Sequence, residues 1–592
     1  MLSLFLSIFL NAIVALASPL ARYAQVVGRD TKLQPAYDFV VVGGGTSGLT
    51  VANRLTENPE TSVLVIEYGY LDNREPEIVV PGLLNYTQYL FNITSLPQRG
   101  LNNVTYDVGV AAVVGGGTTV NGMFFDRGSA PDYDAWTKLG NDGWGWEDLL
   151  PYFKKAYRLL AQSTNESSSA HRLKENFFRG WQSLGIRTPS DPSGGDANGV
   201  FWAPSTLDPN DQTRSYARTA HHDPSSTRSN YHLLTGNAAS RILLEDKQAT
   251  GVEYISRESK ELKTVKATKE VILAAGTVHS PQILQLSGVG PKKLLDDLGI
   301  ESVVDLPGVG QNFQDQPTLY ASYDYASNIE PNPSSLYTDE TYNDEQLALY
   351  YSSRQGPFTI CKNSGNTVAF LPLQNTTSDW QTLIDDAEAY PAAKLYPTDT
   401  DPSIIAGYNA QLPLLLFLYA SLRASVSETG FNGASQFPLT IVKPLSRGSI
   451  VINTTDPLAA PLVDYAALTH PVDLDVMLAV LKKHRALIAT DAMQELGPVE
   501  TAPGANVTSD DDLRAALRQQ VTPSYYHPCS TCSMMKREHG GVVAPDLAVY
   551  GLDRLSVVDA SVIPMIPATH TAATVYAIAE KAADIIKARH KL

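Results

Sequence analysis

Two histidines near the C-terminal end of the chain carry side chains suited to acid–base chemistry. His527 opens the segment HPCSTC (527–532), and His570 closes the segment PMIPATH (564–570). A neutral imidazole can accept a hydroxyl proton because its pKa lies near the pH at which most enzymes work. Both histidines lie far downstream of a glycine-rich fingerprint at residues 43–48. A cofactor-binding segment at one end of the chain and paired bases at the other predict redox chemistry.

Cys529 and Cys532 form a Cys-x-x-Cys pair beside His527, a spacing that also occurs in redox and zinc sites. Zinc usually needs four ligands, and the sequence has neither a second such pair nor two histidines at zinc-finger spacing. We therefore expect no metal and interpret the two cysteines as packing residues. Because Cys361 makes the number odd, at most one disulfide can form within the chain, and the partner of Cys361 stays open.

The glycine fingerprint lies between a predicted strand and a predicted helix. The apolar run at 37–42 is typical of a strand buried on both faces, and residues 49–55 are typical of a helix. Gly43 permits the tight turn, Gly45 lets the backbone approach a pyrophosphate, and Gly48 allows the helix to pack closely on the strand. This order of elements predicts dinucleotide binding.

Three further segments support that prediction. A second apolar strand at 62–66 ends in Glu67, where an acidic side chain would accept hydrogen bonds from a ribose. Residues 113–123 form another glycine-rich turn, and a third buried strand at 271–276 leads into a predicted helix at 277–290 that ends in glycines.

Together these segments resemble the glucose-methanol-choline (GMC) oxidoreductases, which are FAD enzymes that oxidise alcohols. The resemblance spans nearly the whole chain after residue 37. Residues 276–290 resemble the second signature of the family, and residues 114–123 resemble the core of its first. Weaker similarities lie at 306–315, 444–448 and 557–561.

The resemblance implies an α/β fold with two domains, as the length of 592 residues also suggests. A Rossmann-like FAD-binding domain, discontinuous in sequence, would comprise residues 37–150, 230–317 and 522–592. A substrate-binding domain of sheet and helices, with its loops, would comprise residues 151–229 and 318–521.

The family pattern also places FAD against particular residues of this chain. The phosphates would lie at Thr46 and Ser47, the ribose at Glu67, the isoalloxazine along Asn121, Gly122, Met123 and Phe124, and the ribityl chain and ring edge at Asp559, Ala560, Thr571 and Ala572. Some members of the family bind flavin covalently through a histidine at the position of Asn121. An amide cannot form that bond, so the resemblance predicts noncovalent FAD.

Within the same resemblance, His527 matches the catalytic base of the family and His570 matches the second residue of the pair, which is histidine or asparagine. An alcohol held between the two side chains would lose its hydroxyl proton to His527 while its hydride passes to flavin N5. The other histidines are interpreted as core or surface residues.

The substrate is predicted only as a class. Tyr526 precedes His527 and would place an aromatic ring near the alcohol, which favours a flat substrate. Phe91 lies in a segment where aryl-alcohol oxidases carry aromatic side chains, but Ile93 replaces the expected tyrosine, which argues against simple benzyl alcohol. The chain resembles the secreted fungal branch of aryl-alcohol oxidases and patulin-synthase-like enzymes. This predicts a primary alcohol on an aromatic or unsaturated secondary metabolite, oxidised to an aldehyde or lactone.

Several alternatives stay open from the sequence. The electron acceptor is either O2, which would give H2O2, or a quinone, and the protein is either a monomer or a homodimer. A sugar oxidase or dehydrogenase and a hydroxynitrile lyase would share the fold, and the lyase would use the histidine pair without flavin redox. A catalytically silent binding protein fits less well, because both histidines and all FAD segments are present.

Charge and the N-terminal segment limit the partners and the location. The net charge of −17 and a pI near 5.1 argue against binding to nucleic acid. Residues 1–17 are apolar, end in Ala-Leu-Ala, and predict a secretory signal peptide, since the run is shorter than the ~20 residues of a membrane span. We therefore expect a secreted glycoprotein, with glycosylation sequons at Asn85, Asn92, Asn103, Asn165, Asn375, Asn453 and Asn506.

Overall fold

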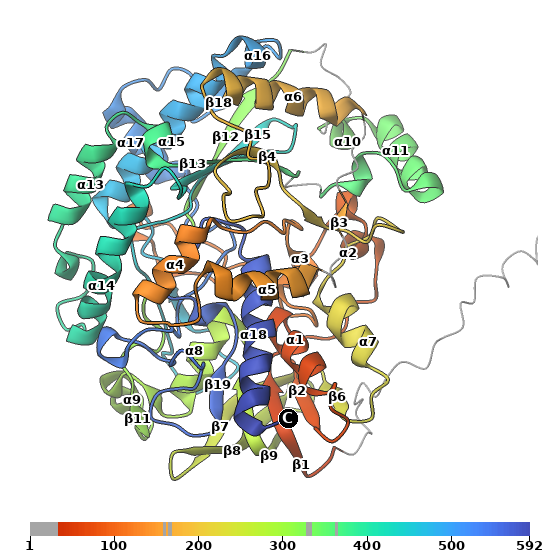
Figure 1. Ribbon diagram of the computed structural model, residues 1–592, viewed down its shortest axis with the longest axis vertical. Helices are drawn as coiled ribbons and strands as arrows, with labels where there is room; N and C mark the ends of the chain where they lie inside the picture. Colours follow the sequence, from red (N-terminus) through yellow and green to blue (C-terminus); the bar gives the residue numbers. More distant parts are fainter. Residues whose placement is uncertain (1–32, 158–161, 164–167, 327–333, 362–364) are drawn as a thin grey trace, which may run out of the picture.

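Two β-sheets lie toward opposite ends of the long axis of the molecule, with helices between and around them (Figure 1). The structure is a computed structural model that describes residues 33–157, 162–163, 168–326, 334–361 and 365–592. The predicted signal peptide at 1–17 and the sequon at Asn165 lie outside the described residues.

The first sheet has seven strands in the order β6-β2-β1-β9-β8-β7, and β19 pairs with β9 off this path. Strands β1, β2, β6, β9 and β19 are parallel to their neighbours in this group, whereas β7 and β8 form an antiparallel extension. Their bounds are β1 Ala36–Val42, β2 Val63–Ile66, β6 Tyr231–Leu234, β7 Asn237–Glu245, β8 Gln248–Ser256, β9 Leu262–Leu273 and β19 Leu555–Val557. The predicted strands at 37–42 and 62–66 are confirmed. The third, predicted at 271–276, is the end of the longer strand β9 and stops at residue 273, because α8 begins at Gly276.

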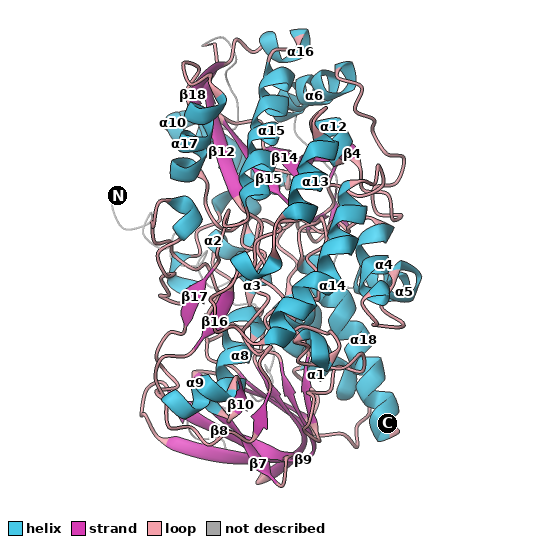
Figure 2. Cartoon of the chain, turned by 90° about the vertical axis from the view of Figure 1, so that its left-hand side faces the viewer, coloured by secondary structure: helices cyan, strands magenta, loops and turns pink. Residues whose placement is uncertain are grey.

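Four helices pack against this sheet or against one another (Figures 1 and 2). Helix α1 (Thr46–Leu55) follows β1 after the glycine turn, and α18 (Ala572–His590) lies beside α1 and α5 (Trp146–Tyr157). Helix α8 (Gly276–Leu286) follows β9 and ends four residues earlier than the predicted 290, because residues 289–290 form the short strand β10.

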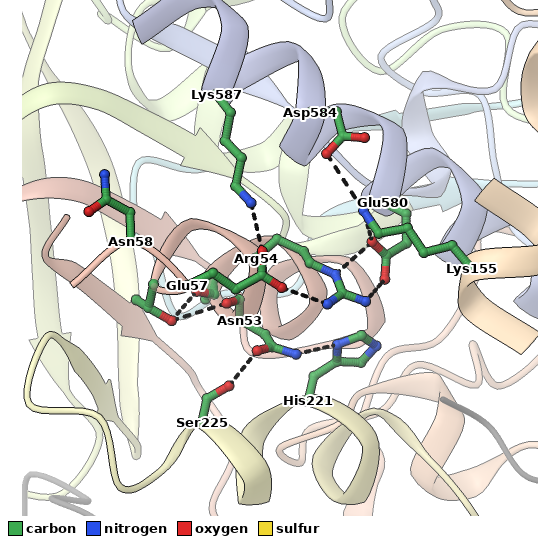
Figure 3. A network of polar contacts seen from close by, with 12 residues as sticks. Asn53, Arg54, Glu57, Asn58, Lys155, His221, Ser225, Glu580, Asp584 and Lys587 are labelled. Atoms are coloured by element: carbon green, nitrogen blue, oxygen red, sulfur yellow. Dashed lines mark hydrogen bonds and ion pairs between the residues drawn. The ribbon is translucent and has the colours of Figure 1, made fainter. Parts of the chain in front are cut away.

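A network of ion pairs fixes the C-terminal end of α1 to α18 (Figure 3). Nε and Nη2 of Arg54 each donate to a carboxyl oxygen of Glu580 over 2.7 Å, and the side chain of Glu580 is fully buried. Glu57 bridges Arg54 and Lys587 at 2.7 and 2.8 Å, which adds a second link between the helices. Because α1 also follows the glycine turn, this network holds in place the helix that the fingerprint begins.

The second sheet is antiparallel and has six strands in the order β18-β12-β15-β14-β13-β4. Every residue of β14 is buried. The bounds of its strands are β4 Gly199–Trp202, β12 Thr318–Asp324, β13 Thr367–Leu371, β14 Ser427–Phe431, β15 Gln436–Ile441 and β18 Val499–Ala502. The main helices around it are α6 Ser168–Ser183, α13 Trp380–Ala389, α14 Pro402–Tyr419, α15 Pro471–Ile488 and α17 Asp510–Gln520.

The chain passes between the two sheets more than once. Strand β4 joins the second sheet before the chain returns to the first sheet with β6 to β9. It leaves again for β12 to β15 and β18, and comes back with β19 and α18. Each sheet is therefore discontinuous in sequence, as the predicted α/β architecture requires, while the exact domain bounds remain a prediction. No helix within the described ranges is both long and apolar enough to cross a bilayer.

Candidate active site

The turn between β1 and α1 requires glycine at two of the predicted positions. Gly43 has a φ of +105°, and a Cβ there would lie 2.3 Å from the carbonyl oxygen of Ala274. A Cβ on Gly48 would lie 1.9 Å from the carbonyl oxygen of Gly43. Any larger side chain at either position would collide with backbone atoms, and the helix would have to move away from the strand to make room.

The second glycine-rich segment packs against the first. The amide of Gly115 donates to the carbonyl oxygen of Gly44 over 2.8 Å, and a Cβ on Gly116 would lie 2.8 Å from the Cα of Gly45. Thr46 and Ser47 form the first turn of α1 beside this contact. Two loops that are far apart in sequence thus form one glycine-lined surface at the N-terminal end of a helix, where an anion is favoured.

Two buried carboxylates tie these loops to the sheet. Glu67 accepts hydrogen bonds from the amides of Gly44 at 2.6 Å and Gly69 at 2.7 Å, and burial raises the pKa of its carboxyl group. Asp559 accepts from the amide of Gly276 at 3.0 Å and from the hydroxyl of Ser280 at 2.6 Å. Each carboxylate stands at the end of a parallel strand, where ligands of open α/β sheets bind.

The residues in this region fit a dinucleotide such as FAD. The hydroxyl of Ser47 is buried and has no hydrogen-bond partner in the part of the chain that the structure describes, so it can serve a ligand. A Cβ on Gly117 or on Gly276 would meet no atom within 4 Å. There is therefore open space beside the second glycine-rich segment and beside the start of α8. Ala560 follows Asp559, and Thr571 and Ala572 begin α18 directly after His570.

The segment predicted to lie along the isoalloxazine joins this region to the histidines. The Asn121 side-chain oxygen accepts from Nη1 of Arg214 at 2.7 Å and from the amide of Met123 at 3.1 Å, which fixes the loop that includes Gly122. The ring of Phe124 stacks on the imidazole of His570 with centroids 4.0 Å apart and an angle of 3° between the planes.

The hydrogen bonds around His527 fix the tautomer in which Nδ1 carries the proton and Nε2 can act as a base. The amide nitrogen of Gln316 donates to the carbonyl oxygens of Val442 and Pro567 at 3.2 and 3.3 Å, so its amide oxygen faces His527. Nδ1 of His527 must therefore carry the proton that it donates to this oxygen over 2.7 Å. Burial, and then the positive charge of His570, lower the pKa of His527 to about 3. The imidazole is neutral at ordinary pH, and the lone pair on Nε2 can accept a proton.

His570 has the opposite charge state. Its Nδ1 donates to Oδ1 of Asp126 over 2.9 Å, and its Nε2 lies 3.5 Å from Oε1 of Glu428. Burial lowers the pKa of His570, but the charges of Asp126 and Glu428 and the hydrogen bond to Asp126 outweigh it and raise the pKa to about 9. The side chain is therefore an imidazolium whose Nε2 has a proton to donate.

The two imidazoles lie next to each other, with ring centroids 5.3 Å apart and an angle of 88° between the planes. One ring is a neutral acceptor and the other a charged donor, so an alcohol oxygen between them could receive a hydrogen bond and lose its proton. This is the arrangement needed to stabilise and deprotonate a hydroxyl group.

The aromatic ring beside both histidines belongs to Tyr525. Its centroid lies 5.3 Å from that of His527 and 5.8 Å from that of His570. Tyr526 has a φ of +63°, is 60% exposed, and packs beside Gly109. Phe91 packs between Tyr68 and His279, with centroids 4.5 and 4.4 Å away. The pocket roles of Tyr526 and Phe91 stay predictions.

Sequence reasoning did not find the partners of the histidines. Asp126, Gln316, Glu428 and Tyr525 carry no motif of their own, although Gln316 directly follows the quoted similarity at 306–315. Cys529 and Cys532 are free, buried thiols, and burial raises the pKa of both, so they pack as neutral side chains. Among the described residues, no group of His, Cys, Asp or Glu side chains is arranged to hold a metal ion.

Known proteins resemble this chain over nearly its whole length. Family models described as GMC oxidoreductase match residues 37–318 with the N-terminal part and residues 444–579 with the C-terminal part. A dehydrogenase of Emericella nidulans, xptC, is 38% identical over 98% of both chains. A solved FAD-dependent oxidoreductase from Chaetomium thermophilum is 42% identical, with a TM-score of 0.90 over 94% of this chain and 100% of that one. A solved fungal aryl-alcohol oxidase is 36% identical, with a TM-score of 0.87 over 95% of this chain and 100% of that one.

Proposed function

Because this chain belongs to the GMC oxidoreductases, a family of FAD-dependent enzymes that act on alcohols, we propose that it oxidises a primary alcohol on an aromatic or unsaturated metabolite. The product is an aldehyde. Where a second hydroxyl of the substrate adds to that aldehyde, the resulting lactol becomes a lactone only through a second two-electron oxidation, for which bound FAD would again be the hydride acceptor. The observation that carries the proposal is the pairing of a neutral His527 with a cationic His570 at adjoining rings.

The reaction needs a group that accepts the hydroxyl proton and a group that holds the alcohol oxygen in place, and the two histidines can fill these roles. His570 donates a hydrogen bond from Nε2 to the substrate oxygen, while Asp126 holds the ring through Nδ1. Nε2 of His527 accepts the hydroxyl proton, while Gln316 holds its tautomer. When bound, FAD supplies the acceptor for the hydride that leaves the carbinol carbon.

The flat rings around the histidines favour an aryl substrate. Phe124 covers one face of His570, and the edge of Phe370 approaches it with centroids 6.3 Å apart. Tyr525 closes the site beside His527. An aromatic ring can stack or pack edge-on against such walls, whereas a sugar would leave its hydroxyl groups facing apolar atoms.

The experiment that tests this function is an anaerobic screen of chemically diverse alcohols against the FAD-loaded protein. Loss of the visible absorbance of FAD, with formation of the matching aldehyde, is the expected result for aryl carbinols. We further propose O2 as the electron acceptor, so each hit should produce H2O2 in air. If no alcohol in the panel reduces FAD, the proposed function is wrong, and cyanide release from mandelonitrile would then indicate a lyase.

We also propose that FAD is bound noncovalently. The amide of Asn121 has no nucleophilic nitrogen and is already fixed by Arg214 and Met123. Acid precipitation of the holoprotein should therefore leave all of the FAD in the supernatant. An Asn121→His variant treated in the same way serves as the control, because it restores the side chain that can form the bond. Flavin that stays with the wild-type pellet would contradict the proposal.

Secretion and glycosylation belong to the same proposal. Asn85, Asn92, Asn103, Asn453 and Asn506 are exposed and Asn375 is partly buried, so a glycosyltransferase could reach most of the predicted sequons. Their exposure supports a chain that passes through the secretory pathway, as the apolar segment at 1–17 predicts.

A further inference from the structure

Glu428 is a buried carboxyl group that helps to raise the pKa of His570, but the mechanism above gives it no contact with the substrate. It lies on β14, opposite Phe370 of β13 and Thr440 of β15, and it is fully buried. Neither of its carboxyl oxygens hydrogen-bonds to any residue in the ranges that the structure describes. A buried acceptor without a donor is costly, so such a group needs an explanation.

The carboxyl group faces the reacting end of the site. Oε1 of Glu428 lies 3.5 Å from Nε2 of His570, which is beyond an ordinary hydrogen bond but close enough for an ion pair. Nε2 is also the atom that would hold the alcohol oxygen. A substrate bound there must therefore place its neighbouring atoms beside Glu428.

The surroundings of Glu428 favour a substrate that donates a hydrogen bond. Burial raises the pKa of Glu428 to about 7, although the positive charge of His570 opposes this, so the group is an anionic acceptor above that pH. Burial, and then the charge of Glu428, raise the pKa of the Tyr525 phenol. The two negative charges of Asp126 and Glu428 exceed the single positive charge of His570, so a carboxylate on the substrate would be repelled.

We propose that Glu428 is a specificity-determining residue that accepts a hydrogen bond from a second hydroxyl group of the substrate. Preferred substrates are then aryl carbinols that also carry a phenolic or alcoholic hydroxyl, and carboxylated aryl carbinols are rejected. The inference rests on the proposed alcohol oxidation, and it adds the chemical group by which the pocket selects among alcohols.

The test compares matched pairs of substrates that differ only in the donor. Each hydroxybenzyl alcohol isomer is paired with its methoxybenzyl ether, and the rate constant for FAD reduction divided by Kd is measured anaerobically at a pH above 7. In the wild type, at least one hydroxy isomer should exceed its ether by about tenfold or more, as expected for a hydrogen bond to a charged group. Glu428→Leu should reduce this ratio to within about twofold, and Glu428→Gln, which keeps one acceptor oxygen, should give an intermediate ratio.

A purely positional role of Glu428 gives a different result. If the carboxylate only holds His570, Glu428→Leu lowers both rates of a pair equally and leaves the ratio unchanged, which overturns the proposal. The proposal is also overturned if the wild type shows no preference for any hydroxy isomer over its ether.

A binding measurement separates this proposal from the proposed function. Cresols and their methyl ethers lack the reacting hydroxymethyl group, and their Kd is read from the perturbation of FAD absorbance. Tighter binding of a cresol than of its ether in the wild type, lost in Glu428→Leu, supports the acceptor role even if no alcohol is oxidised. Equal binding of all pairs in the wild type contradicts it even if oxidation occurs.

Discussion

Replacing His527 by alanine is expected to lower the rate constant for FAD reduction by an alcohol by a factor of about 10² or more. The substitution removes the only neutral imidazole of the pair, and the adjoining His570 is protonated and cannot accept the proton. The rate is measured by anaerobic rapid mixing with saturating substrate. The imidazole of His527 bonds to Gln316 and its backbone amide donates to the side-chain carboxylate of Asp315, whereas neither group bonds to the glycine loops, so FAD should be retained.

The matched control is His539→Ala. His539 lies in a short surface turn at 537–539 and is partly exposed. Its removal should leave the rate within about twofold of wild type, as for most surface substitutions. A His527→Ala variant that reduces FAD at nearly the wild-type rate would show that another group accepts the proton.

Replacing His570 by leucine is the second large effect. The variant loses the hydrogen bond to the alcohol oxygen and leaves Asp126 and Glu428 without the cation between them. Removal of one charge-stabilising donor from an active site typically lowers a rate by about 10²–10³. Stopped-flow reduction of FAD is expected to show a loss of this size at saturating substrate, since the donor acts most strongly as negative charge develops on oxygen.

His570→Asn distinguishes the donor from the charge. The amide of asparagine can still donate to the substrate oxygen, so the rate should recover to within about tenfold of wild type if donation is the main contribution. If FAD reduction in His570→Asn is as slow as in the leucine variant, the positive charge itself is required. A leucine variant as fast as wild type would remove His570 from the reaction.

The elements around the cofactor could be predicted because their signals are local. The apolar run of β1, the glycine turn and the apolar strand β2 each fix one element within a few residues, and Gly43 has the positive φ that the turn needs. The predicted end of helix α8 at residue 290 is wrong, since residues 289–290 pair with β11 (Val304–Asp305), and that contact is not visible in a local pattern.

The groups that set the charges of the histidines could not be predicted in this way. Asp126 lies 444 positions from His570 in the sequence, and Gln316 lies 211 positions from His527. Only the fold brings them together. The neighbouring tyrosines show the same limit, because no motif in the sequence indicates that the ring of Tyr525 lies beside both histidines.

The pH dependence of anaerobic FAD reduction by an aryl carbinol tests the central claim most directly. A histidine of ordinary pKa would be mostly protonated at pH 5, and the rate constant would fall by about 30-fold between pH 8 and 5. His527, with its pKa lowered to about 3, stays neutral across this range and loses activity only as the pH approaches that value. The measurement should be repeated with Glu428→Gln, because Glu428 itself titrates near pH 7. We predict reduction in both proteins with a rate constant that changes by less than about threefold between pH 8 and 5 in the variant. A loss of about 30-fold in the variant, or no reduction of FAD by any carbinol, would contradict a neutral His527 as the proton acceptor.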